Sequence, residues 1–275
     1  MDKKISLINA LLTKLEKVIV AFSGGVDSSV LLKLAYDCLG KENVLAVTAI
    51  GSMYPSEEKL QAQKIAKIVG AKLIFCENPA MNNTEFLANT SLRCYYCKKA
   101  IMGHLKKLAK EQGYNAVIAG ENADDVSDYR PGHKAIEELG IICPLQEAKL
   151  TKTEIREIAR KIGLPNWNIP ANPCLVTRVA YGDVLDCVLL KKIDKAETFI
   201  RQLGFDVVRV RVHKEIARIE VLSKDIEKLA RDDFRKKIVE KLSELGFLYI
   251  SADLKGYRMG SVNEMIAKQI DNNRR

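Results

Sequence analysis

The sequence contains no apolar run that approaches the roughly 20 residues needed to cross a bilayer, so it predicts no membrane-spanning helix. Internal repeats and low-complexity segments are also absent, which argues against a repeat architecture. The N-terminal stretch M-D-K-K-I-S-L-I-N-A lacks the long apolar segment and the cleavage site of a signal peptide, and we therefore expect a cytoplasmic protein. The seven cysteines are an odd number, which does not suit a disulfide framework.

The composition is that of an ordinary globular protein, with 47% apolar and 29% charged residues among 275. This length allows one large domain or two modest ones with a substantial core. The net charge of +9 suits a nucleic acid or a polyanionic small molecule as ligand, or simply a solvated basic surface. Because the basic residues are scattered over helical segments rather than gathered in a tail, we do not expect a nucleic acid as partner.

The first 165 residues alternate short apolar runs with amphipathic segments of helical period. Strands are predicted at Lys17–Phe22, Val44–Ala49, Lys72–Cys76, Ala116–Ala119 and Ile141–Cys143. Helices are predicted at Lys4–Leu15, Ser28–Leu39, Ser56–Val69, Cys97–Gln112 and Lys152–Ile162. This alternation predicts an α/β fold with a doubly wound parallel sheet, whose ligands bind beyond the carboxyl ends of the strands.

A proline-rich stretch then interrupts the alternation. Pro165, Pro170 and Pro173 exclude a continuous helix or a central strand, and we interpret residues 166–184 as a functional connector. Residues 185–275 predict a smaller α+β domain for substrate binding or oligomerisation. Its predicted elements are a helix at Leu185–Leu203, strands at Asp206–Val212 and Ile216–Leu222, a long charged helix at Lys224–Leu245 and a strand at Phe247–Ala252. The predicted domain boundaries are therefore 1–165, 166–184 and 185–275.

The stretch Val18–Ser29, V-I-V-A-F-S-G-G-V-D-S-S, is the most informative part of the chain. An apolar β-branched run, a Ser-Gly-Gly turn and an Asp-Ser-Ser are typical of a strand, a tight turn and the start of a helix. Backbone N–H groups and the helix dipole bind anions at such a junction, and glycines let the backbone approach closely. The Walker sequence is absent, and S-G-G-V-D-S-S resembles instead the PP-loop of enzymes that split ATP between its α and β phosphates. The residues expected to bind ATP are Ser23, Gly24, Gly25, Asp27, Ser28 and Ser29.

Three cysteines have a spacing that points to sulfur or metal chemistry. Cys94 and Cys97 form a C-x-x-C at a predicted helix start, where the helix dipole favours the thiolate, and Cys174 lies in the connector. If the connector folds over the carboxyl edge of the sheet, three thiolates converge there. Such a set suits a 4Fe-4S cluster with one open iron that holds hydrosulfide. The alternatives are a zinc site completed by His104 or His133, a redox pair in which Cys174 carries a persulfide, and three cysteines that are unrelated to one another.

The segment Gly120–Gly132, G-E-N-A-D-D-V-S-D-Y-R-P-G, follows a predicted strand and adds polar side chains at the same edge. Carboxylates there, those of Asp124, Asp125 and Asp128, suit Mg²⁺ on a pyrophosphate. Arg130 suits a phosphate oxygen. A helix cap followed by a turn is the plain alternative.

A third group of polar residues lies in the smaller domain. The alternation Val207–His213 places Arg209 and Arg211 on one face of a strand. Guanidinium groups in a row suit a phosphate monoester or carboxylates, although a solvated polar face has the same pattern. Arg178, which follows Cys174 closely, is expected to bind a substrate carboxylate or phosphate near the sulfur centre.

Together, Val18–Ser29, G-E-N-A-D-D-V-S-D-Y-R-P-G, N-W-N, P-C-L-V-T-R-V-A-Y-G and V-R-V-R-V-H-K-E-I-A-R-I-E resemble the LarE family over nearly the whole chain. The resemblance implies a PP-loop ATP pyrophosphatase fold of the adenine nucleotide alpha hydrolase-like type. It also implies an ATP-dependent sulfur transferase of nickel-pincer nucleotide biosynthesis. The implied substrate is pyridinium-3,5-biscarboxylic acid mononucleotide, whose carboxylates are adenylated and converted to thiocarboxylates. A sulfide donor is implied as a partner, and the family includes homo-oligomers.

The resemblance places the sulfur-bearing residue at Cys174. Family members that sacrifice their own cysteine lack counterparts of Cys94 and Cys97. This chain has both, so it resembles the three-cysteine branch, in which Cys94, Cys97 and Cys174 carry a 4Fe-4S cluster and a cluster-bound sulfide is the nucleophile.

The resemblance also implies the positions of the two substrates. MgATP is expected on Ser23–Ser29, with Asp27 organising the Mg²⁺. Arg209 and Arg211 are expected to hold the phosphate of the mononucleotide.

Other functions use a similar loop. A tRNA thiolase of the PP-loop type also carries a three-cysteine cluster, although no zinc ribbon or RNA module is recognisable in this sequence. An ammonia-using synthetase such as GMP or NAD synthetase needs no convergent thiols. A non-catalytic nucleotide sensor is a further alternative.

Overall fold

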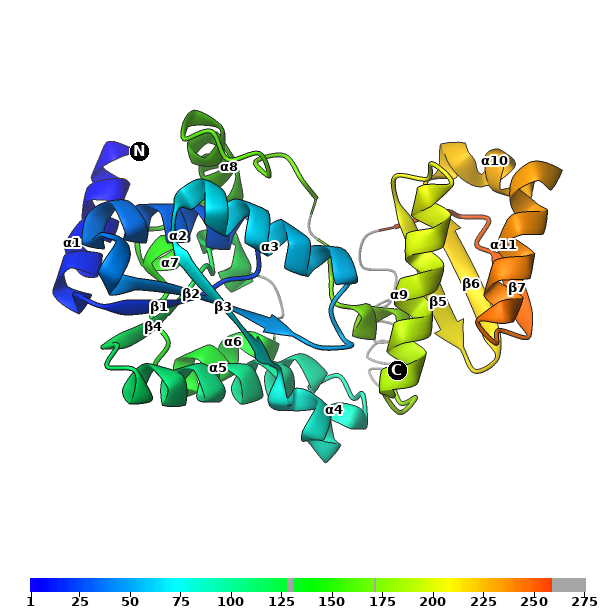
Figure 1. Ribbon diagram of the computed structural model, residues 1–275, viewed down its shortest axis with the longest axis horizontal. Coiled ribbons are helices and arrows are strands. Elements are labelled where there is room, and N and C mark those ends of the chain that lie inside the picture. Colours follow the sequence, from blue (N-terminus) through cyan, green and yellow to red (C-terminus); the bar gives the residue numbers. More distant parts are fainter. Residues whose placement is uncertain (128–130, 171, 259–275) are drawn as a thin grey trace, which may run out of the picture. The chain divides into compact units, whose positions relative to one another are not determined.

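The computed structural model describes residues 1–127, 131–170 and 172–258, and the chain divides into two compact units (Figure 1). Unit 1 comprises Met1–Asn172 and unit 2 comprises Pro173–Arg275. The division falls inside the predicted connector, so residues 166–172 belong to unit 1 and residues 173–184 to unit 2.

Unit 1 is built on a parallel sheet of four strands, which confirms the predicted fold class. The strands β1 (Val18–Ala21), β2 (Val44–Ile50), β3 (Lys72–Glu77) and β4 (Ala116–Ala119) lie in the order β3-β2-β1-β4. In β1, Ala21 lies opposite Val47 of β2 and Ala119 of β4. The strand order reverses at β1, and ligands bind beyond the carboxyl ends of the strands at such a point.

Helices cover both faces of this sheet, so the fold is doubly wound (Figure 1). One face carries α1 (Asp2–Leu15), α2 (Val26–Leu39), α3 (Ser56–Val69) and α8 (Lys152–Lys161). The other face carries α5 (Arg93–Glu111) and α6 (Pro131–Glu138). Shorter helical segments are α4 (Thr84–Leu87), α7 (Pro144–Glu147) and the 3-10 turns Lys41–Asn43, Pro79–Asn82 and Ala123–Ser127.

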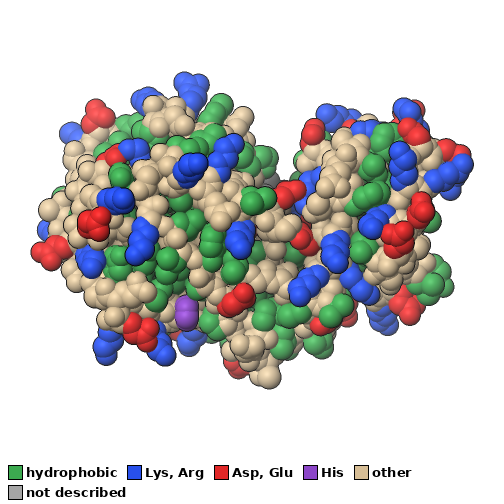
Figure 2. Space-filling view, in the orientation of Figure 1, with side chains coloured by type: hydrophobic (Ala, Val, Ile, Leu, Met, Phe, Trp, Pro, Cys, Tyr) green, Lys and Arg blue, Asp and Glu red, His purple; other side chains and the backbone are tan. Residues whose placement is uncertain are grey.

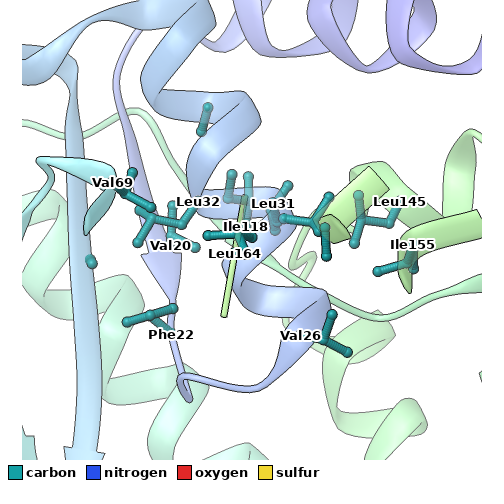
Figure 3. Close-up of a cluster of buried hydrophobic side chains, with 14 of the residues drawn as sticks. Val20, Phe22, Val26, Leu31, Leu32, Val69, Ile118, Leu145, Ile155 and Leu164 are labelled. Carbon is teal, nitrogen blue, oxygen red and sulfur yellow. The ribbon is translucent and has the colours of Figure 1, made fainter. Parts of the chain in front are cut away.

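The hydrophobic core of unit 1 lies around β1 and α2 (Figure 3). Val20, Leu31 and Leu32 have no exposed surface, and Ile118 of β4 packs among them. The β-branched run of β1 is buried on both faces, as a central strand of a parallel sheet must be. This packing fixes the end of β1 and the start of α2, and so fixes the turn between them.

Most predicted bounds in unit 1 agree with the structure within one or two residues, but one predicted strand is absent and the starts of two helices near the candidate site differ. Ile141–Cys143 is not a strand, because Pro144 follows and starts α7; Ile142 makes only an isolated parallel bridge to Ile118. Helix α5 begins at Arg93 rather than Cys97, so the C-x-x-C lies within its first two turns. Helix α2 begins at Val26 rather than Ser28, because its N-cap is Gly25.

Unit 2 is a smaller α+β unit, as predicted. Its sheet has the order β5-β6-β7, with β5 (Val208–His213), β6 (Ile216–Val221) and β7 (Tyr249–Ala252). β5 and β6 form an antiparallel hairpin, whereas β6 and β7 are parallel. The amphipathic helix α9 (Cys187–Gln202) packs on β5, and a 3-10 turn at Leu175–Arg178 precedes it.

The prediction of one long helix at Lys224–Leu245 is wrong. The structure has a 3-10 turn at Ser223–Asp225 and two helices, α10 (Ile226–Ala230) and α11 (Asp232–Glu244). Arg231 between them has an extended backbone, with φ −64° and ψ 144°. Asp232 and Asp233 then occupy the first turn of α11, where carboxylates stabilise a new helix N-terminus.

The surface carries charges of both signs. Lys and Arg side chains are scattered over the visible face of each unit, with Asp and Glu among them (Figure 2). In the part of the chain that the structure describes, no helix is long and apolar enough to cross a membrane.

The core position Leu31 provides a test of the packing. Leu31→Ala is expected to lower the free energy of unfolding by about 2–5 kcal/mol, because it removes buried methyl groups and leaves a cavity. Leu7 on α1 is 54% exposed, so Leu7→Ala is expected to change that free energy by less than about 1 kcal/mol. Urea unfolding followed by circular dichroism measures both values, and equal effects would contradict the packing described.

Candidate active site

The turn between β1 and α2 presents backbone N–H groups at the carboxyl edge of the sheet. No side chain caps the first turn of α2, which begins at Val26. The first N–H groups of a helix have no intrahelical acceptor and carry the positive end of its dipole. The predicted strand, turn and helix are therefore confirmed, and their geometry is that of an anion site.

Two glycines bring separate parts of the chain to this turn. Gly24 has φ +77°, and a Cβ there would lie 3.1 Å from the backbone of Ala62. Gly120 follows β4, and a Cβ there would lie 2.9 Å from the backbone nitrogen of Ser28. A side chain at Gly120 would therefore push the loop after β4 away from the N-terminus of α2.

Serine hydroxyl groups hold the shape of the turn. The hydroxyls of Ser28 and Ser29 donate to the carbonyl oxygen of Gly25 at 3.1 and 2.7 Å. The N–H of Gly25 donates to Ser23 Oγ at 3.3 Å, and the hydroxyl oxygens of Ser23 and Ser28 lie 3.1 Å apart. The structure thus brings together every residue predicted for the loop.

Asp27 lies in the first turn of α2 and faces the start of α8. Its Oδ2 forms an ion pair with Lys152 Nζ, whereas its Oδ1 is buried and has no hydrogen-bond partner among the described residues. Burial raises the pKa of Asp27, and the hydrogen bond and charge of Lys152 oppose that rise. A buried carboxylate oxygen that lacks a donor is suited to a divalent cation.

Lys152 is a residue that the sequence analysis missed. Thr151 and Glu154 form a capping box, which makes Lys152 the first residue of α8. The backbone N–H of Lys152 donates to Asp124 Oδ2 at 2.8 Å, while its ammonium group reaches Asp27. The T-K-T-E sequence carries the signal for the helix start, but it contains nothing that indicates Asp27 as partner.

The acidic segment after β4 contributes carboxylates at the same edge. Asp125 is buried, and its Oδ2 accepts from the N–H of Asn122 at 3.0 Å. The charge of Asp125 also raises the pKa of Asp27, although less than burial does. Asp128 and Arg130, which were predicted with them, lie outside the described residues.

Cys94 and Cys97 lie on α5, with different surroundings. Cys94 is exposed, whereas Cys97 is half-buried, with its Sγ 3.4 Å from Asn78 Nδ2 and 3.9 Å from Met53 Sδ. Burial raises the pKa of the Cys97 thiol. The sequence analysis expected the helix dipole to favour the thiolate, whereas desolvation at Cys97 favours the neutral thiol.

Cys174 is the second residue of unit 2, and Arg178 binds its backbone carbonyl group. Arg178 is 1% exposed, and its Nη1 donates to the carbonyl oxygens of Pro173 at 2.7 Å and Cys174 at 3.2 Å. Its Nε and Nη2 donate to the two carboxylate oxygens of Glu197 on α9, at 2.8 and 3.0 Å. Arg178 therefore ties the backbone at Cys174 to α9, and Glu197 balances its charge.

The two arginines of β5 are buried, so the alternative of a solvated polar face is wrong: Arg209 is 9% and Arg211 is 7% exposed. Arg211 Nε forms an ion pair with Glu220 at 2.7 Å. Arg209 has no ion pair among the described residues; its guanidinium group lies 5.3 Å from the ring centre of Tyr257. Burial and, to a lesser extent, the charge of Arg178 lower the pKa of Arg209. The charge of Glu197 opposes this shift, and Arg209 Nη1 donates to the carbonyl oxygen of Val208 at 2.7 Å. A buried cation without a direct ion-pair partner favours an anionic ligand.

The predicted cluster ligands belong to different units. Cys94 and Cys97 lie in unit 1, whereas Cys174 lies in unit 2. Within the described residues, no group of three or more His, Cys, Asp and Glu side chains is arranged to hold a metal ion. The convergence of the three thiols stays a prediction.

The ion pair between Asp27 and Lys152 predicts a pH-dependent contribution to stability. Burial raises the pKa of Asp27 overall, whereas Lys152 favours the ionised form of Asp27. The ion pair therefore stabilises the fold above this raised pKa, and the stabilisation is lost as the pH falls through it. Lys152→Met is expected to cost about 1–2 kcal/mol at neutral pH and less in acid, because both partners are partly exposed.

Urea unfolding over a pH series measures this effect. In the Asp27→Asn background, Lys152→Met should have a cost that does not vary with pH. The interpretation is wrong if the cost of Lys152→Met in the wild-type background is also independent of pH.

Comparison with known proteins extends this picture. The family model of NAD synthase matches residues 7–85, which include the turn between β1 and α2. One of the subunits of the glutamine-hydrolysing GMP synthase of Archaeoglobus fulgidus is 31% identical over 54% of this chain and 52% of its own length. These two matches cover only part of the chain.

Two relatives match nearly the whole chain. An uncharacterised protein of Synechocystis is 38% identical over 98% of this chain and 100% of its own length. The pyridinium-3,5-bisthiocarboxylic acid mononucleotide synthase of Lactiplantibacillus plantarum is 38% identical over 97% of this chain and 95% of its own length. The resemblance found in the sequence is thereby confirmed: the chain belongs to the family of this synthase, the LarE family.

Proposed function

We propose that this protein is an ATP-dependent sulfur transferase that converts the carboxylates of pyridinium-3,5-biscarboxylic acid mononucleotide into thiocarboxylates. The observation that carries the proposal is the match to the Lactiplantibacillus plantarum synthase, because it extends over 97% of the chain and so includes both units. The two units would supply the two anion sites that this reaction needs. Unit 1 has a helix N-terminus suited to a polyphosphate, and unit 2 has a buried arginine suited to a phosphate monoester.

In unit 1, the residues fit MgATP as a substrate. The N–H groups at the start of α2 would bind phosphate oxygens. Gly24 and Gly120 allow the chain to pack closely at this turn, because a Cβ at either position would meet backbone atoms. Asp27 Oδ1, which is buried and lacks a donor, would be a ligand of Mg²⁺. Lys152 would neutralise the remaining oxygen of Asp27 or a phosphate oxygen beside it.

The first chemical step is adenylation. A carboxylate oxygen of the mononucleotide attacks the α-phosphorus of ATP, the bond to the bridging oxygen breaks, and pyrophosphate leaves. The N–H groups of the α2 N-terminus and the ammonium group of Lys152 would stabilise the negative charge that develops on the pyrophosphate. The carboxylate then carries AMP as a leaving group.

The second step exchanges AMP for sulfur. We propose that Cys94, Cys97 and Cys174 hold a 4Fe-4S cluster, because three thiols without a fourth are the donor set that leaves one iron open. When bound, the cluster would supply a hydrosulfide nucleophile that a sulfide donor replenishes. Asn78 would orient Cys97, since its amide lies 3.4 Å from the sulfur.

In unit 2, Arg209 is the better of the two predicted phosphate ligands. Its guanidinium group is buried without an ion pair in the described region, whereas Arg211 is already bonded to Glu220. Arg211 would complete the site from the same face of β5. Arg178 would act by fixing the backbone of Cys174, since Glu197 and backbone carbonyls occupy its guanidinium group; direct contact between Arg178 and the substrate stays a prediction.

The alternative functions explain less of the chain. The matches to the GMP synthase polypeptide and to the NAD synthase model are partial, and ammonia-using chemistry gives no role to the C-x-x-C on α5. A tRNA thiolase has a similar loop and a three-cysteine cluster of the kind proposed here, but the match over nearly the full length favours the mononucleotide as acceptor.

The function is tested with anaerobically purified protein, MgATP, sulfide and pyridinium-3,5-biscarboxylic acid mononucleotide. We expect AMP, pyrophosphate and a product in which sulfur replaces a carboxylate oxygen, identified by mass spectrometry. Cys174→Ala should abolish the product. A double variant, Cys94→Ala with Cys97→Ala, should lose repeated turnover, and Cys38→Ala on α2 is the matched control that should keep it.

The same experiment separates the sulfur sources. Iron and sulfide analysis of the purified protein is expected to show the cluster. If instead Cys174 loses the mass of one H₂S in each turnover, its own sulfur is consumed and the cluster is not the source.

Substitution of Arg209 tests the phosphate site. Arg209→Ala is expected to raise the KM for the mononucleotide about 10- to 100-fold and to leave the KM for ATP unchanged, because a charge-assisted hydrogen bond is lost. Arg209→Lys should recover only part of the loss, since lysine cannot bind a phosphate bidentately. Arg231→Ala, at a mostly exposed arginine, serves as control; steady-state kinetics that show equal effects at both positions would refute the assignment.

A further inference from the structure

Two side-chain amides from distant parts of unit 1 bind the same carbonyl group in the turn between β1 and α2. Gln61 Nε2, on α3, donates to the carbonyl oxygen of Gly24 at 2.9 Å. Asn166 Nδ2, beyond the end of α8, donates to the same oxygen at 2.8 Å. Gln61 is half-buried and Asn166 is 1% exposed, so water competes little for either bond.

These bonds control the direction of a neighbouring N–H group. Gly24 and Gly25 share one planar trans peptide, in which the C=O and the N–H point in opposite directions. Fixing the carbonyl of Gly24 therefore fixes the N–H of Gly25. Such control is needed here, because glycine has little intrinsic preference between positive and negative φ and a Gly-Gly peptide rotates easily.

The N–H of Gly25 is poorly satisfied in the structure. It donates to Ser23 Oγ at 3.3 Å, longer than a usual N–H···O hydrogen bond. A phosphate oxygen would be a stronger acceptor because it carries charge. In this orientation the N–H of Gly25 would form a stronger hydrogen bond with a bound anion than the one it forms with Ser23.

Asn166 fixes a second group of the turn at the same time. Its Nδ2 lies 3.0 Å from Ser29 Oγ, and that hydroxyl donates to the carbonyl oxygen of Gly25 at 2.7 Å. Both neighbours of Nδ2 accept hydrogen bonds, which determines the orientation of the amide. Its Oδ1 is buried and has no partner among the described residues, an arrangement that costs stability. The Nδ2 group of Asn166 therefore donates to the turn, while its Oδ1 accepts no hydrogen bond from a described residue.

We propose that Gln61 and Asn166 are positioning residues that hold the Gly24–Gly25 peptide with its N–H toward the pyrophosphate part of a ligand. They do not touch the ligand; they keep the anion site in its binding geometry before the ligand arrives, which reduces the entropy lost on binding. The inference rests on the proposed function in that ATP is the ligand concerned. The chemical class that the site recognises is a pyrophosphate-bearing molecule.

The test measures binding to the full-length protein of three probes, ATP, inorganic pyrophosphate and adenosine, in the presence of Mg²⁺. Gln61→Met and Asn166→Leu remove the donors without adding charge and with little change in size. Each is expected to weaken binding of ATP and pyrophosphate about tenfold, which corresponds to one hydrogen bond, and to leave adenosine binding unchanged. Gln63→Met and Asn168→Leu, at exposed positions on the same segments, are the controls and should bind all three probes like wild type.

The outcomes separate this inference from the proposed function. If wild-type protein binds pyrophosphate and both variants bind it equally well, the inference is overturned and the proposed function stands. If a variant loses pyrophosphate and adenosine binding in the same proportion, or loses both together with its Tm, its role is merely structural and the inference is again overturned. If wild-type protein binds neither ATP nor pyrophosphate, both proposals fail.

Discussion

The anion site of unit 1 depends on the bare N-terminus of α2. No side chain caps this helix, so its first N–H groups stay available at the carboxyl edge of the sheet. The parallel pairing of β1 with β4 brings Gly120 against Ser28, and the left-handed Gly24 packs on α3. A side chain at either glycine would displace backbone, so the close approach of three chain segments is a condition for the site.

Charge compensation around this N-terminus is the second constraint. Burial favours the neutral form of Asp27, whereas Lys152 favours its ionised form. One carboxylate oxygen is paired, whereas the other has no partner within the described residues. The site therefore has a carboxylate oxygen that can bind a cation beside N–H groups that can bind an anion. A magnesium-bound polyphosphate carries the complementary cation and anion.

Charge compensation in unit 2 involves buried arginines. Glu197 and Glu220 neutralise Arg178 and Arg211, and the resulting ion pairs fix the turn after Cys174 and the hairpin of β5 and β6. Because both pairs are buried, loss of either glutamate would leave an uncompensated charge inside the unit. Arg209 differs from both, since no described carboxylate forms an ion pair with it, although the charge of Glu197 favours its ionised form. This difference distinguishes an arginine that stabilises the fold from one suited to a ligand.

The sequence by itself determined the parallel α/β fold, the strand-turn-helix at Ser23–Ser29 and the smaller second unit, because each follows from local periodicity and turn chemistry. It also carried the family resemblance, since the motifs are contiguous. Only the tertiary structure decided that Lys152 pairs with Asp27, that Asn166 holds Gly24, and that Arg211 is neutralised by Glu220. The partners in these pairs are 125, 142 and 9 positions apart. Their meeting depends on how helices and strands pack, and no local pattern of residue types encodes that packing.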